Sequence, residues 1–210
     1  QGQILGTDVD VFDDKGKSTK VGQKGELVVK QPFPSMPVKF WGDISGEKYH
    51  NAYFTRFKNI WHHGDFIERT VNNGFIMRGR SDATLNPGGV RIGTSEIYQQ
   101  VENIDFITEA LVVGQDYKDD IRIILFVTTK NNKELNDKKI TLIKTKIRKN
   151  CSPKHVPTLI IKVPEIPRTK SGKIVELAVR KVLNGEEIDN KEAIANPERL
   201  NFYKNLEQLK

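Results

Sequence analysis

FITEALVVG (residues 106–114) and IRIILFVTT (residues 121–129) are the two stretches of the sequence that decide the fold. Both are short apolar runs in which β-branched residues are frequent, and such residues favour strands. A polar hexapeptide, residues 115–120, separates them. We therefore predict two neighbouring strands at the centre of the second half of the chain.

The segments around these strands alternate between helical and strand patterns. We predict a helix over residues 94–101, with Thr94 as a candidate N-cap ahead of Ile97 and Val101, which lie at helical spacing. The remaining predicted elements are a helix over residues 140–150, a strand over 159–163, and a helix over 174–183 that ends at Asn184-Gly185. The resulting order is helix, strand, strand, helix, strand, helix, which predicts an α+β layer.

The first eighty residues have a different pattern, mostly of short strands and turns. An Asn72-Asn73-Gly74 turn joins two predicted strands, residues 61–69 and 74–80. Residues 31–37 contain three prolines and are therefore predicted to be a loop or a sheet edge. Residues 49–57 are rich in aromatics and are a candidate short helix. We place the boundary between the two parts near Ser81-Asp82.

Composition excludes several classes of protein. The 210 residues, 37% apolar and 29% charged, are typical of one large or two small globular domains. No run approaches the 18 apolar residues of a membrane helix, and residues 1–6 do not resemble a signal peptide. The single cysteine, Cys151, excludes an internal disulfide and a multi-cysteine zinc site. A reducing cytoplasm fits this composition.

The positive charge is concentrated in one segment. Residues 141–181 hold eleven Lys or Arg and two acids, a net +9, whereas the rest, with 23 basic and 25 acidic residues, carries −2. Such a segment suits a partner with several phosphates, either a nucleic acid or a nucleotide or coenzyme, although a solvated basic face is equally compatible. The segment contains no Phe, Tyr or Trp, which argues against a nucleic-acid-binding module.

Three segments combine glycine with a basic residue, which allows a close backbone approach to a ligand and supplies donors for phosphate. They are Gly79-Arg80-Ser81-Asp82, Gly88-Gly89-Val90-Arg91 and Ser171-Gly172-Lys173. Each alone is weak. Taken in order with His63-Gly64-Asp65, residues 89–97 and residues 167–174, they resemble the adenylate-forming acyl-CoA synthetases, and the resemblance covers nearly the whole chain.

This resemblance implies an α+β fold in two parts. Residues 1–81 would be the β-rich C-terminal subdomain of the large AMP-binding domain, residues 82–190 the small α+β lid domain, and residues 191–210 a polar tail. The phosphate loop, adenine site and acyl pocket of the family have no counterpart here. We therefore expect the C-terminal part of a longer enzyme, inactive alone.

The activity implied is ligation of a carboxylic acid to coenzyme A in two steps. The acid attacks the α-phosphate of ATP to give an acyl-adenylate, and the thiol of CoA then displaces AMP. Residues 32–37, 81–91 and 196–198 resemble the acetoacetate branch, and acetate, propionate or another short acid is the alternative. ATP, CoA and Mg²⁺ are the implied substrates and cofactors, with no nucleic-acid or membrane partner and a cytoplasmic location.

The family motifs also imply a role for each matching residue. Lys173 would be catalytic, bridging the carboxylate and the α-phosphate; Asp82 would be the hinge. Contacts to ATP or AMP would come from Asp65, Arg80 and Arg91, and contacts to CoA from Gly88, Gly89 and Arg148. Val90 stands where acetyl-CoA synthetases commonly carry His. A metal ion on backbone carbonyls would involve Glu102, Ile104 and Ile107.

Each residue also has a plainer interpretation. Asp65 is compatible with a turn residue and Arg80 with a surface partner of Asp82. A cation at Lys173 is unfavourable beside the start of a helix at Ile174 unless an anion joins it. We reject His62-His63 as a metal pair because adjacent strand residues face opposite ways. A non-catalytic interaction domain is a further alternative, against which the Gly172-Lys173 pair argues.

Overall fold

The computed structural model describes residues 1–188 and 191–209. The chain divides into two compact units, Gln1–Asp82 and Ala83–Lys210. The division follows Asp82 directly and so falls beside the Ser81-Asp82 boundary predicted from the sequence.

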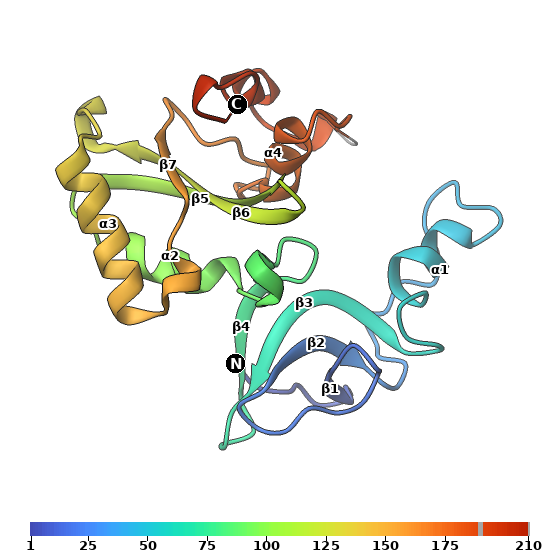
Figure 1. Cartoon of the computed structure of the whole chain (residues 1–210). Helices are drawn as coiled ribbons and strands as arrows, with labels where there is room; N and C mark the ends of the chain where they lie inside the picture. The colour runs from blue at the N-terminus through green and yellow to red at the C-terminus, as the bar shows by residue number, and fades with distance from the viewer. Residues whose placement is uncertain (189–190, 210) are drawn as a thin grey trace. The chain divides into compact units, whose positions relative to one another are not determined.

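Unit 1 is built on a four-stranded antiparallel sheet (Figure 1). Its strands are β1 (Val9–Phe12), β2 (Lys24–Val29), β3 (Trp61–Arg69) and β4 (Phe75–Arg80), in that order across the sheet. Val11, Ile67 and Phe75 form one apolar cluster, and a second includes Phe12 and Phe57. The β3–β4 hairpin was predicted from its Asn-Gly turn, in which Asn73 has a φ of 57°.

The helix of unit 1 begins earlier and ends earlier than expected. Helix α1 spans Glu47–Tyr53, because the Asp43 carboxylate accepts hydrogen bonds from the backbone N–H groups of Lys48 (3.3 Å) and Tyr49 (2.8 Å). Phe57 lies beyond the helix and packs edge-on against Phe12, with ring centroids 5.5 Å apart. An acidic side chain ahead of the aromatic run therefore fixes the start of the helix.

Unit 2 contains a three-stranded sheet in which β5 (Ile107–Tyr117) and β6 (Asp120–Thr129) pair antiparallel and β7 (Leu159–Lys162) pairs parallel to β6. Successive side chains of a strand point to opposite faces. Both faces of this sheet are buried, which explains why β5 and β6 are almost continuously apolar.

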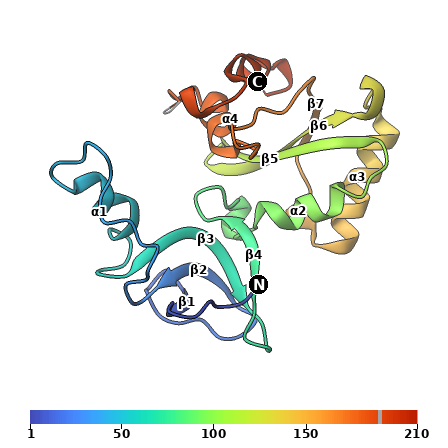
Figure 2. The ribbon, with the colours of Figure 1, turned by 180° about the vertical axis from the view of Figure 1, so that it is seen from behind.

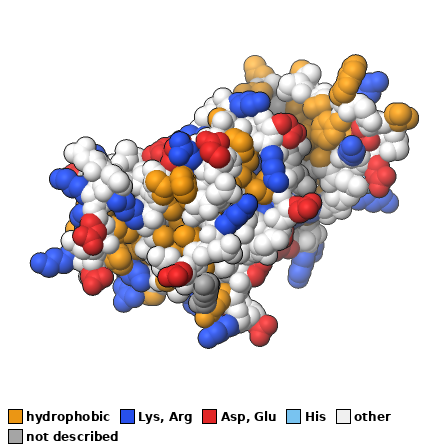
Figure 3. Space-filling model, turned by 90° about the horizontal axis from the view of Figure 1, so that it is seen from above, with side chains coloured by type: hydrophobic (Ala, Val, Ile, Leu, Met, Phe, Trp, Pro, Cys, Tyr) orange, Lys and Arg blue, Asp and Glu red, His pale blue; other side chains and the backbone are white. Residues whose placement is uncertain are grey.

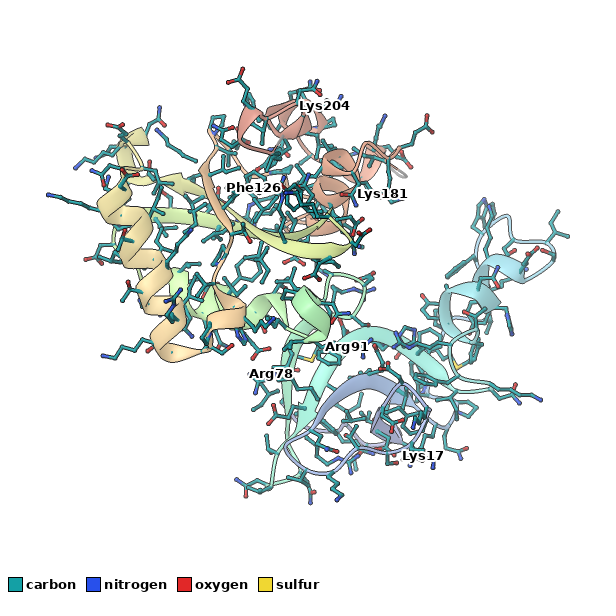
Figure 4. The ribbon with its side chains drawn as sticks, in the orientation of Figure 1. Lys17, Arg78, Arg91, Phe126, Lys181 and Lys204 are labelled. Atoms are coloured by element: carbon teal, nitrogen blue, oxygen red, sulfur yellow. The ribbon has the colours of Figure 1, made fainter. Side chains whose placement is uncertain are left out.

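Helices cover the two faces separately (Figures 1 and 2). On one face α2 (Thr94–Val101) and α3 (Asp137–Asn150) pack on one apolar cluster of the sheet. On the other face lie α4 (Glu176–Leu183) and the 3₁₀ segment η5 (Pro197–Tyr203). Phe126, labelled in Figure 4, contacts Tyr203 there with ring centroids 4.8 Å apart. Shorter 3₁₀ turns are η1 (Pro87–Gly89), η2 (Lys130–Asn132), η3 (Pro153–His155), η4 (Lys191–Ala193) and η6 (Glu207–Leu209).

The described part of the segment expected to be a polar tail, residues 191–209, contributes three buried side chains to the core of unit 2. Ile194, Leu200 and Tyr203 are between 1% and 5% exposed. Their spacing is irregular because the segment forms 3₁₀ turns rather than an α-helix, so the helical period did not reveal them.

In unit 2, α3 begins three residues earlier than predicted and α4 two residues later, whereas α2 has the predicted range with a different N-cap. Gly93 rather than Thr94 is the N-cap of α2, and its N–H donates to the Glu96 carboxylate at 3.0 Å, which leaves Thr94 buried in the first turn. Helix α4 begins at Glu176, since Ile174 pairs with Arg168 in an isolated bridge. Lys173 therefore lies in a turn three residues before the helix, and the helix-dipole argument made for it was wrong.

Candidate functional site

The candidate nucleotide-binding residues of unit 1 lie where β3 and β4 pair. Asp65 on β3 is opposite Arg80 on β4, and the two are ion-paired at 3.6 Å. The Arg80 guanidinium also donates to both carboxylate oxygens of Asp82, at 3.3 and 3.2 Å. Burial would lower the pKa of Arg80, but its bond to Asp82 and the charges of both carboxylates raise it. The plainer interpretation of Arg80 as a partner of Asp82 thus describes this conformation.

Gly64 lets the Arg80 side chain lie against the backbone of β3. A Cβ atom at Gly64 would come within 2.7 Å of the Arg80 guanidinium, and the φ of Gly64 is +83°. The Arg80 side chain further approaches the carbonyl of His63 at 3.4 Å. Glycine at this position is therefore required both by its conformation and by the neighbouring cation.

The two adjacent histidines point to different partners, as the alternation of a strand predicts. His62 contacts the Glu26 carboxylate at 3.1 Å, whereas His63 lies 3.5 Å from Asp65 and is contacted by the Trp61 indole N–H at 3.2 Å. Within the described residues, no group of three or more His, Cys, Asp or Glu is placed to hold a metal ion.

Sequence reasoning did not single out Glu26, which is fully buried and lies on β2, the strand that pairs with β3. Its carboxylate is ion-paired with Arg56 at 2.9 Å and shares a hydrogen bond with the His62 ring at 3.1 Å. Desolvation would raise the pKa of Glu26, but the contact with His62, the Ser81 hydroxyl and the Arg56 charge together lower it. An acid directly before the apolar run Leu27-Val28-Val29 was the sign available in the sequence.

In unit 2 the loop that carries Gly88 and Gly89, which we call the glycine loop, is held by residues that the sequence did not connect to it. The N–H of Gly88 donates to both oxygens of Asp120, at 2.9 and 3.0 Å. A Cβ atom at Gly88, where φ is +56°, would lie 2.6 Å from the Lys154 ammonium. The Gly88 and Ile121 N–H groups and the Lys154 charge lower the pKa of Asp120. An open depression beside the loop is lined by Asn86, Gly89 and residues 116–121.

The two arginines of unit 2 that were predicted to bind phosphate groups, Arg91 and Arg148, are exposed. Arg91, labelled in Figure 4, follows the glycine loop and precedes the buried Ile92. Arg148 lies in the last turn of α3. Among the residues that the structure describes, no ion pair or hydrogen bond involves the guanidinium of Arg148.

The basic residues of the 141–181 segment do not share one surface. Four of them are on α3 and two on α4, which cover opposite faces of the sheet. On the face drawn in Figure 3, basic side chains are interspersed with acidic and apolar ones. This distribution does not favour a continuous track for a nucleic acid.

Lys173 lies in a tight turn whose backbone is fixed while its side chain is exposed. Thr169 N–H donates to the Lys173 carbonyl at 2.8 Å, and the Thr169 hydroxyl accepts from the Lys173 N–H at 3.0 Å. Arg168 donates to the Gly172 carbonyl at 2.7 Å and is ion-paired with Glu109. Among the described residues, the Lys173 ammonium has no hydrogen bond or ion pair. We call residues 168–174 the lysine loop.

The predicted backbone metal positions surround the end of α2. Glu102 is its C-cap and Ile107 begins β5, and the Ile104 carbonyl accepts the Ile107 N–H at 2.9 Å. A metal at these carbonyls stays a prediction. None of the described helices is both long enough and apolar enough to span a membrane.

No family model matches the chain. Among curated proteins, it is 58% identical over all of its 210 residues to an acetoacetyl-coenzyme A synthetase of Rhizobium meliloti (strain 1021), of which it covers 32%. The chain therefore spans about a third of the length of the curated relatives it matches.

Solved structures of related enzymes are also similar to this chain over most of its length. An acetoacetyl-CoA synthetase of Streptomyces lividans superimposes with a TM-score of 0.90 at 40% identity, over 97% of this chain and 31% of that one. A benzoate CoA ligase of Burkholderia xenovorans LB400 matches with a TM-score of 0.70 at 24% identity, over 84% of this chain and 34% of that one, which supports the fold alone.

Proposed function

Because this chain is homologous along its whole length to acetoacetyl-CoA synthetases of the adenylate-forming superfamily, we propose that it forms the C-terminal part of an acetoacetate–CoA ligase. The proposed reaction joins acetoacetate to CoA through an acyl-adenylate and releases AMP and pyrophosphate. The observation that carries the proposal is the identity of 58% over the entire chain.

In unit 1 we assign the ribose and phosphate of the nucleotide to Asp65 and Arg80. The Asp65 carboxylate is fixed by Arg80, so it can accept hydrogen bonds from ribose hydroxyls without losing freedom on binding. Arg80 carries a permanent positive charge that suits a phosphate oxygen. Asp82 is the proposed hinge, and the division of the chain into compact units directly after it supports this assignment.

In unit 2 we assign CoA to Gly88, Gly89 and Arg148, and the AMP phosphate to Arg91. Both glycines have a positive φ, and a Cβ atom at Gly88 would displace Lys154, so this loop can approach a ligand only as glycine. An exposed guanidinium at Arg148 without a protein partner among the described residues is available to a phosphate group.

Lys173 is the proposed catalytic residue of adenylation. In that step an anionic carboxylate attacks an anionic α-phosphate, and a cation between them offsets the repulsion and stabilises the transition state. A compact ammonium group on a flexible stem, with no partner among the described residues, can enter the site for this step and leave it for the next.

ATP would bind together with Mg²⁺, which would neutralise part of the triphosphate charge as a component of the substrate. The carbonyls of Glu102, Ile104 and Ile107 stay a second candidate place for a metal ion. We further propose a cytoplasmic location, small-molecule substrates alone, and no nucleic-acid or membrane partner.

The decisive experiment measures both half-reactions in the longer protein that carries the large domain. Lys173→Ala should lower acetoacetate-dependent exchange of pyrophosphate into ATP by about 10²–10³-fold, the effect of removing one preorganised charge-stabilising group. Conversion of supplied acetoacetyl-AMP to acetoacetyl-CoA should stay within about twofold of the starting protein.

Lys170→Ala is the matched control, because it removes a second exposed lysine from the same loop. Equal losses in both half-reactions, or equal losses in both variants, would contradict the role of Lys173. A panel of acetate, propionate and acetoacetate in the exchange assay tests the acid, and preference for acetate would replace acetoacetate by the alternative substrate.

A further inference from the structure

The lysine loop is held by a segment that lies some twenty residues further along the chain. Thr169 pairs with Ile194 in an isolated bridge. The Lys170 N–H donates to the Ala193 carbonyl at 3.0 Å, and the Ala195 N–H donates to the Arg168 carbonyl at 2.9 Å. Residues 193–196 thus run alongside the loop as an added backbone layer, and we call them the clamp.

Asn196 joins the clamp to the base of the loop through both ends of its amide. Its Oδ1 atom accepts the Arg168 N–H at 3.1 Å, and its Nδ2 group donates to the Glu165 carboxylate at 2.6 Å. Both partners come from the segment immediately before Lys173. One side chain therefore joins the clamp both to the first residue of the lysine loop and to the segment that leads into the loop.

The clamp is itself anchored in the core of unit 2. Ile194 is 5% exposed, and the Tyr203 hydroxyl, from the same face of the sheet, donates to the Glu165 carbonyl at 3.0 Å. Arg199 lies 2.8 Å from the second oxygen of the Glu165 carboxylate. Ile194 and Tyr203 are buried, whereas Lys170 and Lys173 of the loop are exposed, so the core restrains the loop.

We propose that Asn196 is a positioning residue for adenylation, which orients the lysine loop through Arg168 and Glu165 and acts on the reaction only through Lys173. This proposal rests on the proposed function of Lys173. The side chain of Lys173 is free among the described residues, so the direction in which it can extend depends on the backbone of its loop. Loosening that backbone reduces the fraction of molecules with the ammonium in reach of the reacting groups.

Asn196→Asp is the sharpest test. It keeps the size of the side chain and the acceptor for the Arg168 N–H, but it places a second carboxylate against Glu165 where a donor stood. Asn184→Asp is the matched control, since Asn184 in the same unit also donates through Nδ2 to a carboxylate, that of Asp116, at 2.8 Å.

In the full-length protein, Asn196→Asp should lower acetoacetate-dependent exchange of pyrophosphate into ATP about tenfold, corresponding to about 1.4 kcal/mol. Thioester formation from supplied acetoacetyl-AMP should stay within about twofold. Amide hydrogen exchange at Thr169 and Lys170 should accelerate. Adding Glu165→Gln to Asn196→Asp restores a donor–acceptor pair and should recover most of the loss, whereas Asn184→Asp should change neither measurement.

Unchanged pyrophosphate exchange and unchanged amide protection in Asn196→Asp would overturn the proposal, as would an equal fall of both half-reactions. Lys173→Ala, measured in parallel, separates the two levels of inference. If Lys173→Ala abolishes adenylation and Asn196→Asp does not alter it, the positioning role fails and the proposed function stands. If Lys173→Ala leaves adenylation intact, the proposed function fails, and the positioning role fails with it.

Discussion

The end of the β3–β4 hairpin in unit 1 and the lysine loop in unit 2 hold their charged residues in opposite ways. In the hairpin, the side chains fix one another: Arg80 bonds Asp65 and Asp82, and its guanidinium lies against Gly64. In the loop, the backbone is fixed by Thr169 and by the clamp, while the lysine side chain extends into solvent.

This difference separates a group that must be in place before a ligand arrives from one that must move during the reaction. A fixed carboxylate such as Asp65 loses little rotational freedom when it binds, which favours affinity. A cation that serves only one of two successive steps needs a fixed backbone and a mobile side chain. The two regions therefore predict opposite responses of stability to substitution.

The largest effect on stability is expected at Glu26 on β2, the strand that pairs with β3 of the hairpin. Glu26→Ala removes a buried carboxylate and leaves Arg56 and His62 without their shared partner, so unit 1 should lose about 3–5 kcal/mol of unfolding free energy. Urea unfolding measures this loss. Glu68→Ala breaks a pair with Arg78 on the same sheet that is partly exposed, and its cost should be clearly smaller. Equal costs would show that burial at Glu26 is not the source of the effect.

The same carboxylate predicts how the stability of unit 1 depends on pH. The pKa values of Glu26 and Asp10 are both lowered in the folded state, despite burial, by their hydrogen-bond donors and nearby cations. A lowered pKa means that stability is complete above the ordinary carboxyl pKa and is lost as pH falls through the folded value. The urea midpoint should therefore decrease below about pH 4.5, the ordinary pKa of Glu. In Glu26→Gln this decrease should be shallower, and an unchanged slope would refute the assignment.

Gly64→Ala should have an intermediate effect with two separable parts. The positive φ of Gly64 is strained for alanine, and the new Cβ atom would also displace the Arg80 guanidinium, so together we expect a loss of about 1–3 kcal/mol. Gly22→Ala isolates the first part, because Gly22 has a φ of +81° but no atom within 4 Å of its Cβ position. If both variants unfold at the same urea concentration, contact with Arg80 contributes nothing.

The smallest effect on stability is expected at Lys173, where the effect on adenylation should be largest. Lys173→Ala removes an exposed side chain without a partner among the described residues, so its unfolding free energy should change by less than about 0.5 kcal/mol. Arg168→Ala provides the contrast, because the Arg168 side chain bonds Glu109 and the Gly172 carbonyl. A thermal scan that ranks Lys173→Ala as the more damaging substitution would remove the distinction between fixed backbone and free side chain.

The sequence predicted the elements whose pattern is local. The strands of unit 2 followed from apolar runs, and the β3–β4 hairpin followed from its Asn-Gly turn. The range of α2 was predicted, but its N-cap was misplaced by one residue because Gly93 offers no capping side chain, and the Glu96 carboxylate serves that end of the helix instead. The resemblance to known enzymes supplied the site residues, which no local pattern would have distinguished from ordinary turns.

The contacts that organise the candidate sites join positions far apart in the sequence, and these could not be predicted. Asp120 lies 32 residues from Gly88, and Asn196 lies 31 residues from Glu165. Irregular 3₁₀ turns hid the buried members of residues 191–209, whose polar composition indicated a tail. Periodicity detects a face of one element, whereas these interactions depend on how separate elements meet.

The covering of the second sheet face by residues late in the chain has a consequence for how unit 2 is made. During synthesis β5 and β6 can pair as soon as they leave the ribosome. Strand β7 can pair with β6 only after the crossover that contains α3 has been made. Phe126 and its neighbours are then still uncovered until the segment around Leu200 and Tyr203 has left the ribosome. For the time it takes to add those residues, the nascent chain presents an apolar sheet face to solvent, the kind of surface that chaperones bind.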